Sequence, residues 1–158
     1  MFELKPIEPA IRPEVVAKIE QEWGSPVLVS RGRVHRADRL DGFVCRRENE
    51  LVGLVTYDIR LGHCEIVSLD SWLERQGVGG ALVEAVVREA RRQGCRRVWL
   101  ITTNDNTAAM RFYQKRGFRM CALHTGAVAA ARKLKPQIPL VGYDGIPIDH
   151  EIEFEIVL

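Results

Sequence analysis

The fold of this chain is decided by the stretch Glu65-Ile66-Val67-Ser68-Leu69-Asp70-Ser71-Trp72-Leu73-Glu74-Arg75-Gln76-Gly77-Val78-Gly79-Gly80-Ala81-Leu82. It begins with apolar residues typical of a strand, turns through glycines and continues in a helical pattern. The first amides of a helix lack internal partners, the helix dipole adds partial positive charge, and glycines let backbone N–H groups approach a phosphate. The stretch therefore predicts a strand, an anion-binding turn and a helix in direct succession.

The residues after the glycine turn extend this pattern. Residues 80–93 place apolar side chains at helical spacing on one face, and Gly94 is positioned to end the helix. The run from Arg97 to Thr103 is short, apolar and rich in residues that favour strands. A strand, a helix and a second strand in this order predict a parallel crossover.

The N-terminal part predicts a strand, a helix and a hairpin. Residues 2–7 alternate as a half-buried strand does, and a helix is expected from Pro13 to about Trp23. The segment 27–40 has many arginines and no clean periodicity, so we expect a loop or a short helix there. Residues 42–47 and 51–57 are separated by a polar turn and predict a β-hairpin.

The C-terminal part predicts further helices and strands. Helices are expected over 108–115 and 126–135, strands near 118–120 and over 151–158, and a long Pro- and Gly-rich loop over 136–147. Together these elements predict an α/β fold with a mixed sheet of six or seven strands flanked by helices. A length of 158 residues fits one domain, 1–158.

Charge and hydropathy exclude several functional classes. The formal net charge of +2 is too small to predict nucleic-acid binding. We find neither a signal peptide nor an apolar run long enough to cross a membrane, so we expect a cytoplasmic protein. Arginine clusters over 31–39 and 88–97 are expected to be solvated faces.

The four cysteines predict no metal site. They lack a C-x-x-C pair and have no histidine at metal-ligand spacing. We therefore expect free, buried thiols at Cys45, Cys64, Cys95 and Cys121.

The glycine turn differs from the common nucleotide-binding loops. No Gly-Lys-Ser or Gly-Lys-Thr follows it, and its spacing is not G-x-G-x-x-G with an acidic residue ending the next strand. Neither ATP nor NAD is predicted. A turn whose glycines only permit a tight strand-to-helix connection remains the alternative.

Two segments resemble a known family. Glu74-Arg75-Gln76-Gly77-Val78-Gly79 resembles the Q/R-x-x-G-x-G/A coenzyme A loop of the GNAT superfamily of N-acetyltransferases, with Glu74 in place of the usual Gln or Arg. Residues 106–118 fit the family's N-x-x-A-x-x-x-Y-x-x-x-G-F segment at every named position. The resemblance is firm over about 40–120, the acyl-coenzyme A core, and 121–158 would then shape the acceptor side.

The resemblance implies how acetyl-coenzyme A is bound. In the family two central parallel strands diverge in a V-shaped opening, where the pantetheine arm pairs with strand backbone. Backbone amides of the glycine loop hold the diphosphate. The coenzyme-binding residues expected on this basis are Val67, Ser68, Leu69, Arg75, Gln76, Gly77, Val78, Gly79, Gly80, Asn106, Ala109 and Tyr113.

Glu65 is the candidate catalytic base. A protonated amine must lose a proton before it attacks a thioester, and Glu65 is a carboxylate within an apolar strand. Its strand resembles the base-bearing strand of the family's histone-acetylating members, and partial burial would raise its pKa. The alternative is an outward-facing or structurally ion-paired Glu65, with His63 as the fallback base.

Tyr113 is the second catalytic candidate. It stands where the family places the hydroxyl that donates a proton to the departing thiolate, although core packing is the general alternative for such a tyrosine. Asn106 would either contact the pantetheine or cap its own helix.

The function expected from the resemblance is an N-acetyltransferase that moves the acetyl group of acetyl-coenzyme A to an amine by direct attack in a ternary complex. A non-catalytic acyl-coenzyme A sensor or interaction module is the alternative, and a larger acyl group ranks third. The partner would be a small-molecule or peptide amine, with no nucleic acid or membrane. The terminal strand leaves room for a homodimer, and the loop 136–147 is expected to border the acceptor site or form a dimer contact.

Overall fold

A computed structural model describes residues 1–158 as nine strands, four α-helices and three short 3₁₀ turns. The strands are β1 (Glu3–Pro6), β2 (Val27–Ser30), β3 (Arg33–Arg36), β4 (Asp41–Arg47), β5 (Glu50–Arg60), β6 (His63–Ser71), β7 (Arg97–Thr103), β8 (Arg119–His124) and β9 (Glu151–Val157). The helices are α1 (Arg12–Trp23), α2 (Val78–Arg92), α3 (Thr107–Lys115) and α4 (Ala127–Leu134). The turns are η1 (Pro9–Ile11), η2 (Ala37–Arg39) and η3 (Tyr143–Gly145).

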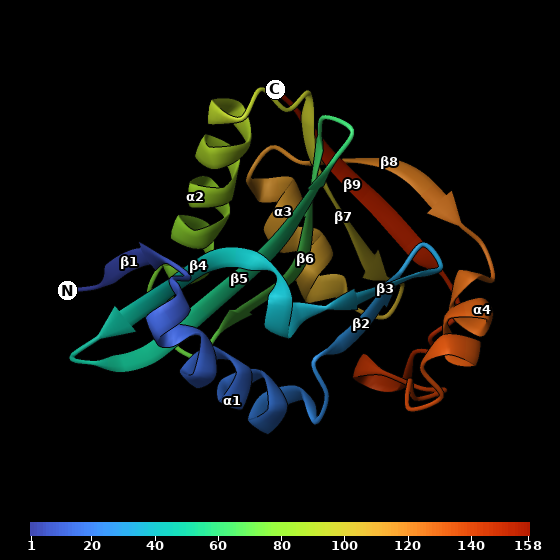
Figure 1. Ribbon diagram of the computed structural model, residues 1–158. Helices are drawn as coiled ribbons and strands as arrows, with labels where there is room; N and C mark the ends of the chain where they lie inside the picture. The colour runs from blue at the N-terminus through green and yellow to red at the C-terminus, as the bar shows by residue number, and fades with distance from the viewer.

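The main sheet has seven strands in the order β1-β4-β5-β6-β7-β9-β8 (Figure 1). Only β6 and β7 are parallel; every other neighbouring pair in this sheet is antiparallel. The mixed sheet and its parallel crossover are therefore confirmed. The β2–β3 hairpin forms a separate two-stranded sheet.

The prediction for segment 27–40 is wrong, because most of it forms this hairpin. Arg31 and Gly32 at its turn have φ of 49° and 72°, the left-handed conformation that a two-residue hairpin turn requires. Each strand has only four residues, too few for the sequence to reveal an alternation. The usable signal was the β-prone run Val27-Leu28-Val29 followed by a residue-glycine turn.

Two hydrophobic clusters pack on opposite faces of the sheet. Helix α2 contributes Val83 and Val86 to the larger cluster, which contains core residues of β5, β6 and β7. Helix α1 contributes Val15 and Ile19 to the smaller cluster, against β4 and β5. The predicted amphipathic face of α2 is confirmed, and it fixes the helix start beside the end of β6.

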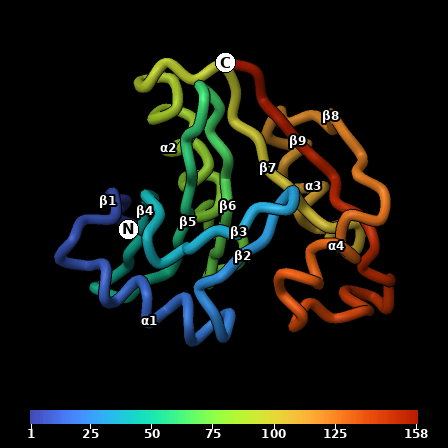
Figure 2. Tube along the Cα trace, turned by 45° about the vertical axis from the view of Figure 1, so that its right-hand side comes forward, coloured from blue at the N-terminus to red at the C-terminus, as the bar shows by residue number.

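The strands β6 and β7 pair only over their first four residues, from His63↔Arg97 to Ile66↔Leu100. Beyond Ile66 the two strands separate, and the traces of β6 and β7 diverge in Figure 2. A β-bulge leaves Val67 without a partner on β5, between the pairs Tyr57↔Ile66 and Thr56↔Ser68. The bulge therefore turns Ser68 to the same face as Glu65, and the V-shaped split is confirmed.

Two expectations about side chains need correction. Cys45, Cys64 and Cys95 are free and buried as expected, but Cys121 is exposed because it lies on the edge strand β8. The arginine clusters are not simply solvated faces, since Arg97 is partly buried among the carboxylates of β9. Separately, no helix combines the length and apolar character that a bilayer crossing requires.

Candidate active site

The glycine loop occupies the end of β6 and the start of α2. Gly77 is the N-terminal cap residue of α2 and has a φ of 79°, a left-handed conformation that glycine adopts without strain. The first-turn amides of α2 have no partner within the helix, and no acidic residue lies in this turn. Arg75, within the loop, also has a positive φ of 58°. The loop thus has the free amides and positive field that favour an anion.

Gly79 and Gly80 also lie close to side chains at the end of α3. A Cβ at Gly79 would lie 3.2 Å from the Phe112 ring, and one at Gly80 would lie 3.2 Å from the Arg116 guanidinium. The Arg116 guanidinium stacks on the Phe112 ring at 3.6 Å. A pocket of about 420 Å³ joins the loop to these two side chains.

Arg116 is a candidate anion-binding residue that the sequence interpretation missed. It lies one residue after α3, at an unnamed position of the segment 106–118, so the motif gave no reason to select it. Its guanidinium adds a second positive charge beside the loop, opposite Arg75 in the same pocket lining. Charge-assisted hydrogen bonds from arginine suit a diphosphate.

The middle of the split is lined by β6 backbone and by α3. Val67, Ser68 and Leu69 follow the last pair between β6 and β7, so their edge toward β7 has no strand partner. Asn106 caps α3, because its Oδ1 accepts a hydrogen bond of 3.1 Å from the Ala109 amide. Of the two roles expected for Asn106, the structure shows the N-terminal cap of α3.

Tyr113 is buried where α3 meets the main core. Its ring makes edge contacts with Phe112 and Phe118 and lies near Phe154. Burial, and then the charge of Asp70 on β6, raises the pKa of its hydroxyl well above the usual range. Tyr113 is therefore fully protonated at neutral pH, as a proton donor must be.

Glu65 lies on the part of β6 that pairs with β7, two residues before the bulge, and the residue is 6% exposed. Burial raises the pKa of its carboxyl to about 7, opposed by a hydrogen bond from Ser30 Oγ to Oε2 at 2.6 Å. A carboxylate with this pKa exchanges protons readily at neutral pH. The alternative of an outward-facing Glu65 is excluded by its burial.

The β2–β3 hairpin supplies two partners of Glu65 that the sequence interpretation missed. His35 Nε2 lies 2.9 Å from Ser30 Oγ and 3.5 Å from Glu65 Oε1. Burial, with a contribution from the Arg33 charge, lowers the pKa of His35 and keeps it neutral. Its buried Nδ1 makes no hydrogen bond, and Asp58 Oδ2 is 3.9 Å away.

A pocket of about 520 Å³ opens over Glu65 on the hairpin side of the sheet. His63 of β6 and Trp99 of β7 line it. Side chains of β3 and β5 and that of Arg96, which directly precedes β7, also line it. His63 Nδ1 accepts a hydrogen bond of 2.7 Å from Arg97 Nε, and burial and the neighbouring arginines lower its pKa. Five arginines line the same pocket: Arg31, Arg33, Arg60, Arg96 and Arg97.

The C-terminal loop lies elsewhere. None of residues 136–147 lines the pocket over Glu65. Ile138 instead lines a smaller pocket with Leu28 of β2, and Tyr143 donates its amide hydrogen to Asp105 after β7. The role of this loop at the acceptor site stays a prediction.

Comparisons with known proteins show the family of this chain. Residues 5–118 match the family model described as the acetyltransferase (GNAT) family. The Bacillus subtilis protein YdhI, of uncharacterised function, is 45% identical over 139 residues, which cover 87% of either chain.

Solved structures share the fold at low identity. A protein described as an IAA acetyltransferase, from Bacillus cereus, has a TM-score of 0.72 at 18% identity, with 100% of each chain covered. A GNAT family acetyltransferase from Elizabethkingia anophelis, solved with acetyl-coenzyme A bound, has a TM-score of 0.69 at 16% identity, covering 99% of this chain and 98% of that one. Given the family match and the identity to YdhI, this chain belongs to the GNAT family of acetyltransferases.

Proposed function

We propose that the protein is an acetyl-coenzyme A-dependent N-acetyltransferase with Glu65 as the base. One observation carries the proposal: a single strand, β6, has an anion-binding glycine loop at its end and a buried carboxylate of raised pKa beside the split from β7. The arrangement offers a place for a diphosphate, a thioester and an amine in sequence along one strand.

The residues at the loop fit the coenzyme. The positive φ of Gly77, the free first-turn amides and the guanidinium of Arg116 form a cradle for a diphosphate. Backbone groups of Val67, Ser68 and Leu69 that face the split are available to the pantetheine amides, in the manner of an added strand.

The proposed reaction moves one acetyl group and balances two protons. Glu65 takes a proton from the acceptor ammonium, and the freed amine attacks the thioester carbonyl. The N–C bond forms, the nitrogen of the tetrahedral intermediate releases its second proton to solvent, the C–S bond breaks, and the departing thiolate takes a proton from the Tyr113 hydroxyl. The donated proton is replaced from solvent, and the proton on Glu65 leaves to solvent after the product departs.

Direct attack is favoured over an acetylated enzyme. Cys64 is the thiol nearest Glu65 in sequence, and burial raises its pKa to about 12. A thiol buried in the core with this pKa is a poor nucleophile. Transfer in a ternary complex needs no such group.

Thiol release from acetyl-coenzyme A with a panel of amines tests the proposal. We expect Glu65→Gln to lower kcat by about 100-fold or more, and Tyr113→Phe to lower it by roughly 10- to 100-fold. Glu20→Gln, on the exposed face of α1, is the matched control and should leave kcat unchanged.

Calorimetry with coenzyme A separates the enzyme from a sensor. The Glu65→Gln variant should bind coenzyme A with the affinity of the parent protein, because Glu65 is not among the residues expected to contact the coenzyme. Binding without turnover across the whole panel would support the non-catalytic alternative. A well-folded protein without affinity for coenzyme A would refute both.

A further inference from the structure

The pocket over Glu65 contains more positive charge than its own carboxylates neutralise. Three of its five arginines have an acidic partner: Arg33 with Asp58 at 3.0 Å, Arg31 with Glu151 at 3.5 Å, and Arg97 with Glu153 and Glu155 at 2.9 and 3.0 Å. Arg60 and Arg96 line the pocket without any ion pair. Arg60 is the register partner of His63 on β5, and Arg96 Nη2 lies 3.3 Å from His63 Nε2.

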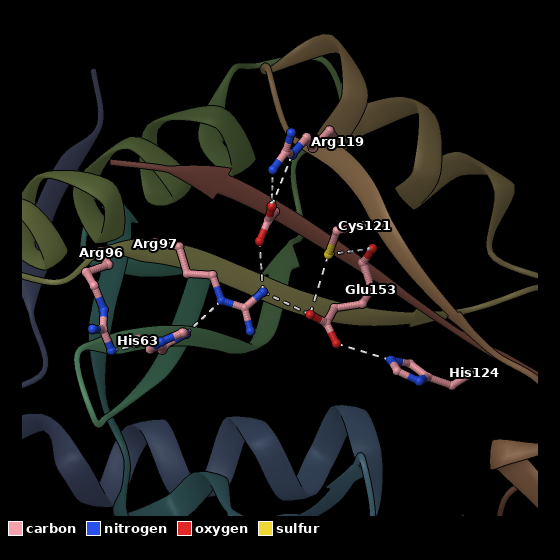
Figure 3. A network of polar contacts seen from close by, with 8 residues as sticks. His63, Arg96, Arg97, Arg119, Cys121, His124 and Glu153 are labelled. Atoms are coloured by element: carbon pink, nitrogen blue, oxygen red, sulfur yellow. Dashed lines mark hydrogen bonds and ion pairs between the residues drawn. The ribbon is translucent and has the colours of Figure 1, made fainter.

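Around His63 the protein groups of the pocket include more hydrogen-bond donors than acceptors. Arg97 Nε and Arg96 Nη2 both approach its ring, at 2.7 Å from Nδ1 and 3.3 Å from Nε2 (Figure 3). A neutral imidazole has only one acceptor nitrogen, and a guanidinium has none. Since the shorter contact uses the Nδ1 lone pair, the ring proton is on Nε2 and faces the N–H groups of Arg96. Two donors therefore face each other at the exposed mouth of the pocket.

An anion placed against Arg96 and His63 Nε2 would accept hydrogen bonds from both donors. Arg60 is aligned with His63 across the β5–β6 turn, so its guanidinium can reach the same anion from the other strand. Arginines bind carboxylate and phosphate groups through paired, charge-assisted hydrogen bonds. The one hydrogen bond that Arg96 makes to protein oxygen, to the Leu61 carbonyl, leaves other donors of its guanidinium free.

An anion bound at His63 would lie close enough to Glu65 to belong to the same molecule as the acceptor amine. Glu65 is two residues beyond His63 on the same face of β6, a spacing of about 7 Å. The coenzyme diphosphate is not this anion, because β6 is nine residues long and the glycine loop follows its far end, roughly 26 Å away. A pocket of about 520 Å³ holds a small molecule.

We propose that the acceptor is a small amine that carries its own anionic group, a carboxylate or a phosphate, bound by Arg60, Arg96 and His63 Nε2–H while its amino group reaches Glu65. This inference rests on the proposed function. Polyamines and other acceptors with a second positive charge are disfavoured, because that charge would lie against two unpaired guanidiniums.

Four acceptors of matched length test the charge preference in a thiol-release assay. They are an ω-amino carboxylate, an ω-aminoalkyl phosphonate, a plain alkylamine and an α,ω-diamine. We expect the better of the two anionic acceptors to exceed the alkylamine and the diamine in kcat/KM by about 10-fold or more. The ratio between the first two acceptors distinguishes a carboxylate site from a phosphate site.

Arginine variants test the assignment to these residues. Arg60→Gln and Arg96→Gln should each raise KM for the anionic acceptor by about 10-fold and leave the alkylamine rate unchanged. Arg39→Gln, an exposed arginine outside this pocket, is the control and should change neither value. Butanoate, an anion without an amine, should compete with the acceptor in the parent protein and lose this effect in Arg96→Gln.

The outcomes separate the inference from the proposed function. Turnover that favours the alkylamine or the diamine overturns the anionic acceptor and leaves the acetyltransferase intact. Arginine variants that behave like Arg39→Gln overturn it too. No thiol release with any acceptor, in protein that binds coenzyme A, overturns the proposed function and the inference with it.

Discussion

At the scale of single residues, the chemistry depends on the environment of Glu65. Burial raises its pKa, the Ser30 hydroxyl lowers it, and the charges that face it act in both directions. Asp58 on β5 and Glu151 on β9 raise its pKa, and Arg33 on β3 lowers it. His35, kept neutral by burial, adds no charge. Glu65 therefore changes protonation near neutral pH because Ser30 offsets part of the cost of burial.

Ser30→Ala should move the acid limb of the pH profile to higher pH. Glu65 acts as a base only when ionised, so kcat/KM rises with pH through its pKa of about 7. The Ser30 hydroxyl stabilises the ionised form, so its loss raises this pKa. The pH dependence of kcat/KM with one fixed acceptor measures the shift, and the acceptor's own titration cancels between variants. Ser30→Thr, which retains the hydroxyl, should restore the parent profile, and an unmoved limb would contradict the argument.

The raised pKa of Glu65 also predicts a pH-dependent stability. The neutral form is favoured in the folded state, so this contribution is present below the unfolded-state pKa and is lost as pH rises through the folded value of about 7. In the parent protein, ionisation of Glu65 should lower the free energy of unfolding by about 2 kcal/mol between pH 5 and pH 8. The Glu65→Gln variant should not show this loss. Urea unfolding at both pH values measures this. Equal losses in parent and variant would show that the Glu65 carboxyl is not perturbed.

At the scale of elements, Phe112 of α3 and Arg116 directly after it lie close to the start of α2. Gly79 packs against Phe112, and Gly80 packs against Arg116, with distances that leave no room for a methyl group without movement. The glycines thus serve two purposes, the approach of backbone to an anion and the approach of two helices. Arg116 lies beside the loop because this contact is close.

Gly79→Ala should weaken coenzyme A binding by separating the two helices. The new Cβ would lie 3.2 Å from Phe112 Cε1 and Cζ, so the ring or the helix must move by a few tenths of an ångström. We expect about 1 kcal/mol of lost stability and roughly 10-fold weaker binding, measured by denaturation and calorimetry. Phe112→Leu added to Gly79→Ala should recover part of both losses, with Phe112→Leu alone as the control. A double variant no better than Gly79→Ala would assign the loss to the loop backbone instead.

At the scale of the whole molecule, one sheet joins the two hydrophobic clusters. Val55 in the larger cluster and Leu54 in the smaller one are neighbours on β5. Such continuity favours cooperative unfolding of the whole chain, as the single-domain prediction requires. The terminal strand, on which the expected homodimer is based, has no free edge, because β9 pairs with β7 on one side and with β8 on the other. A homodimer stays a prediction.

Coenzyme A should raise the melting temperature of a single transition. A ligand that binds only the folded state adds about 2.7 kcal/mol at 100 times its Kd, which corresponds to roughly 5 to 10 °C for a chain of this size. Scanning calorimetry with and without coenzyme A measures this, and ATP at the same concentration is the control. Two separate transitions would contradict the single domain, and an equal shift with ATP would contradict the selectivity of the loop.

The sequence by itself determined the elements whose signals are local. The period of α2 and the glycines before it predicted the crossover, because helix periodicity, caps and turns depend on residues close together in the chain. The glycine loop and the segment 106–118 carried the family resemblance, and that resemblance implied the split strands. Glu65 and Tyr113 were selected in the same way, and their roles stay predictions.

Only the tertiary structure decided what surrounds Glu65. Ser30 and His35 come from a hairpin too short to recognise, Arg60 ends β5, and Arg96 directly precedes β7. These residues meet because the bulge at Val67, the pairing of β6 with β7 and the hairpin fold together. Contacts between residues far apart in the chain have no local pattern, so burial, pKa and pocket charge become known only when the chain is folded.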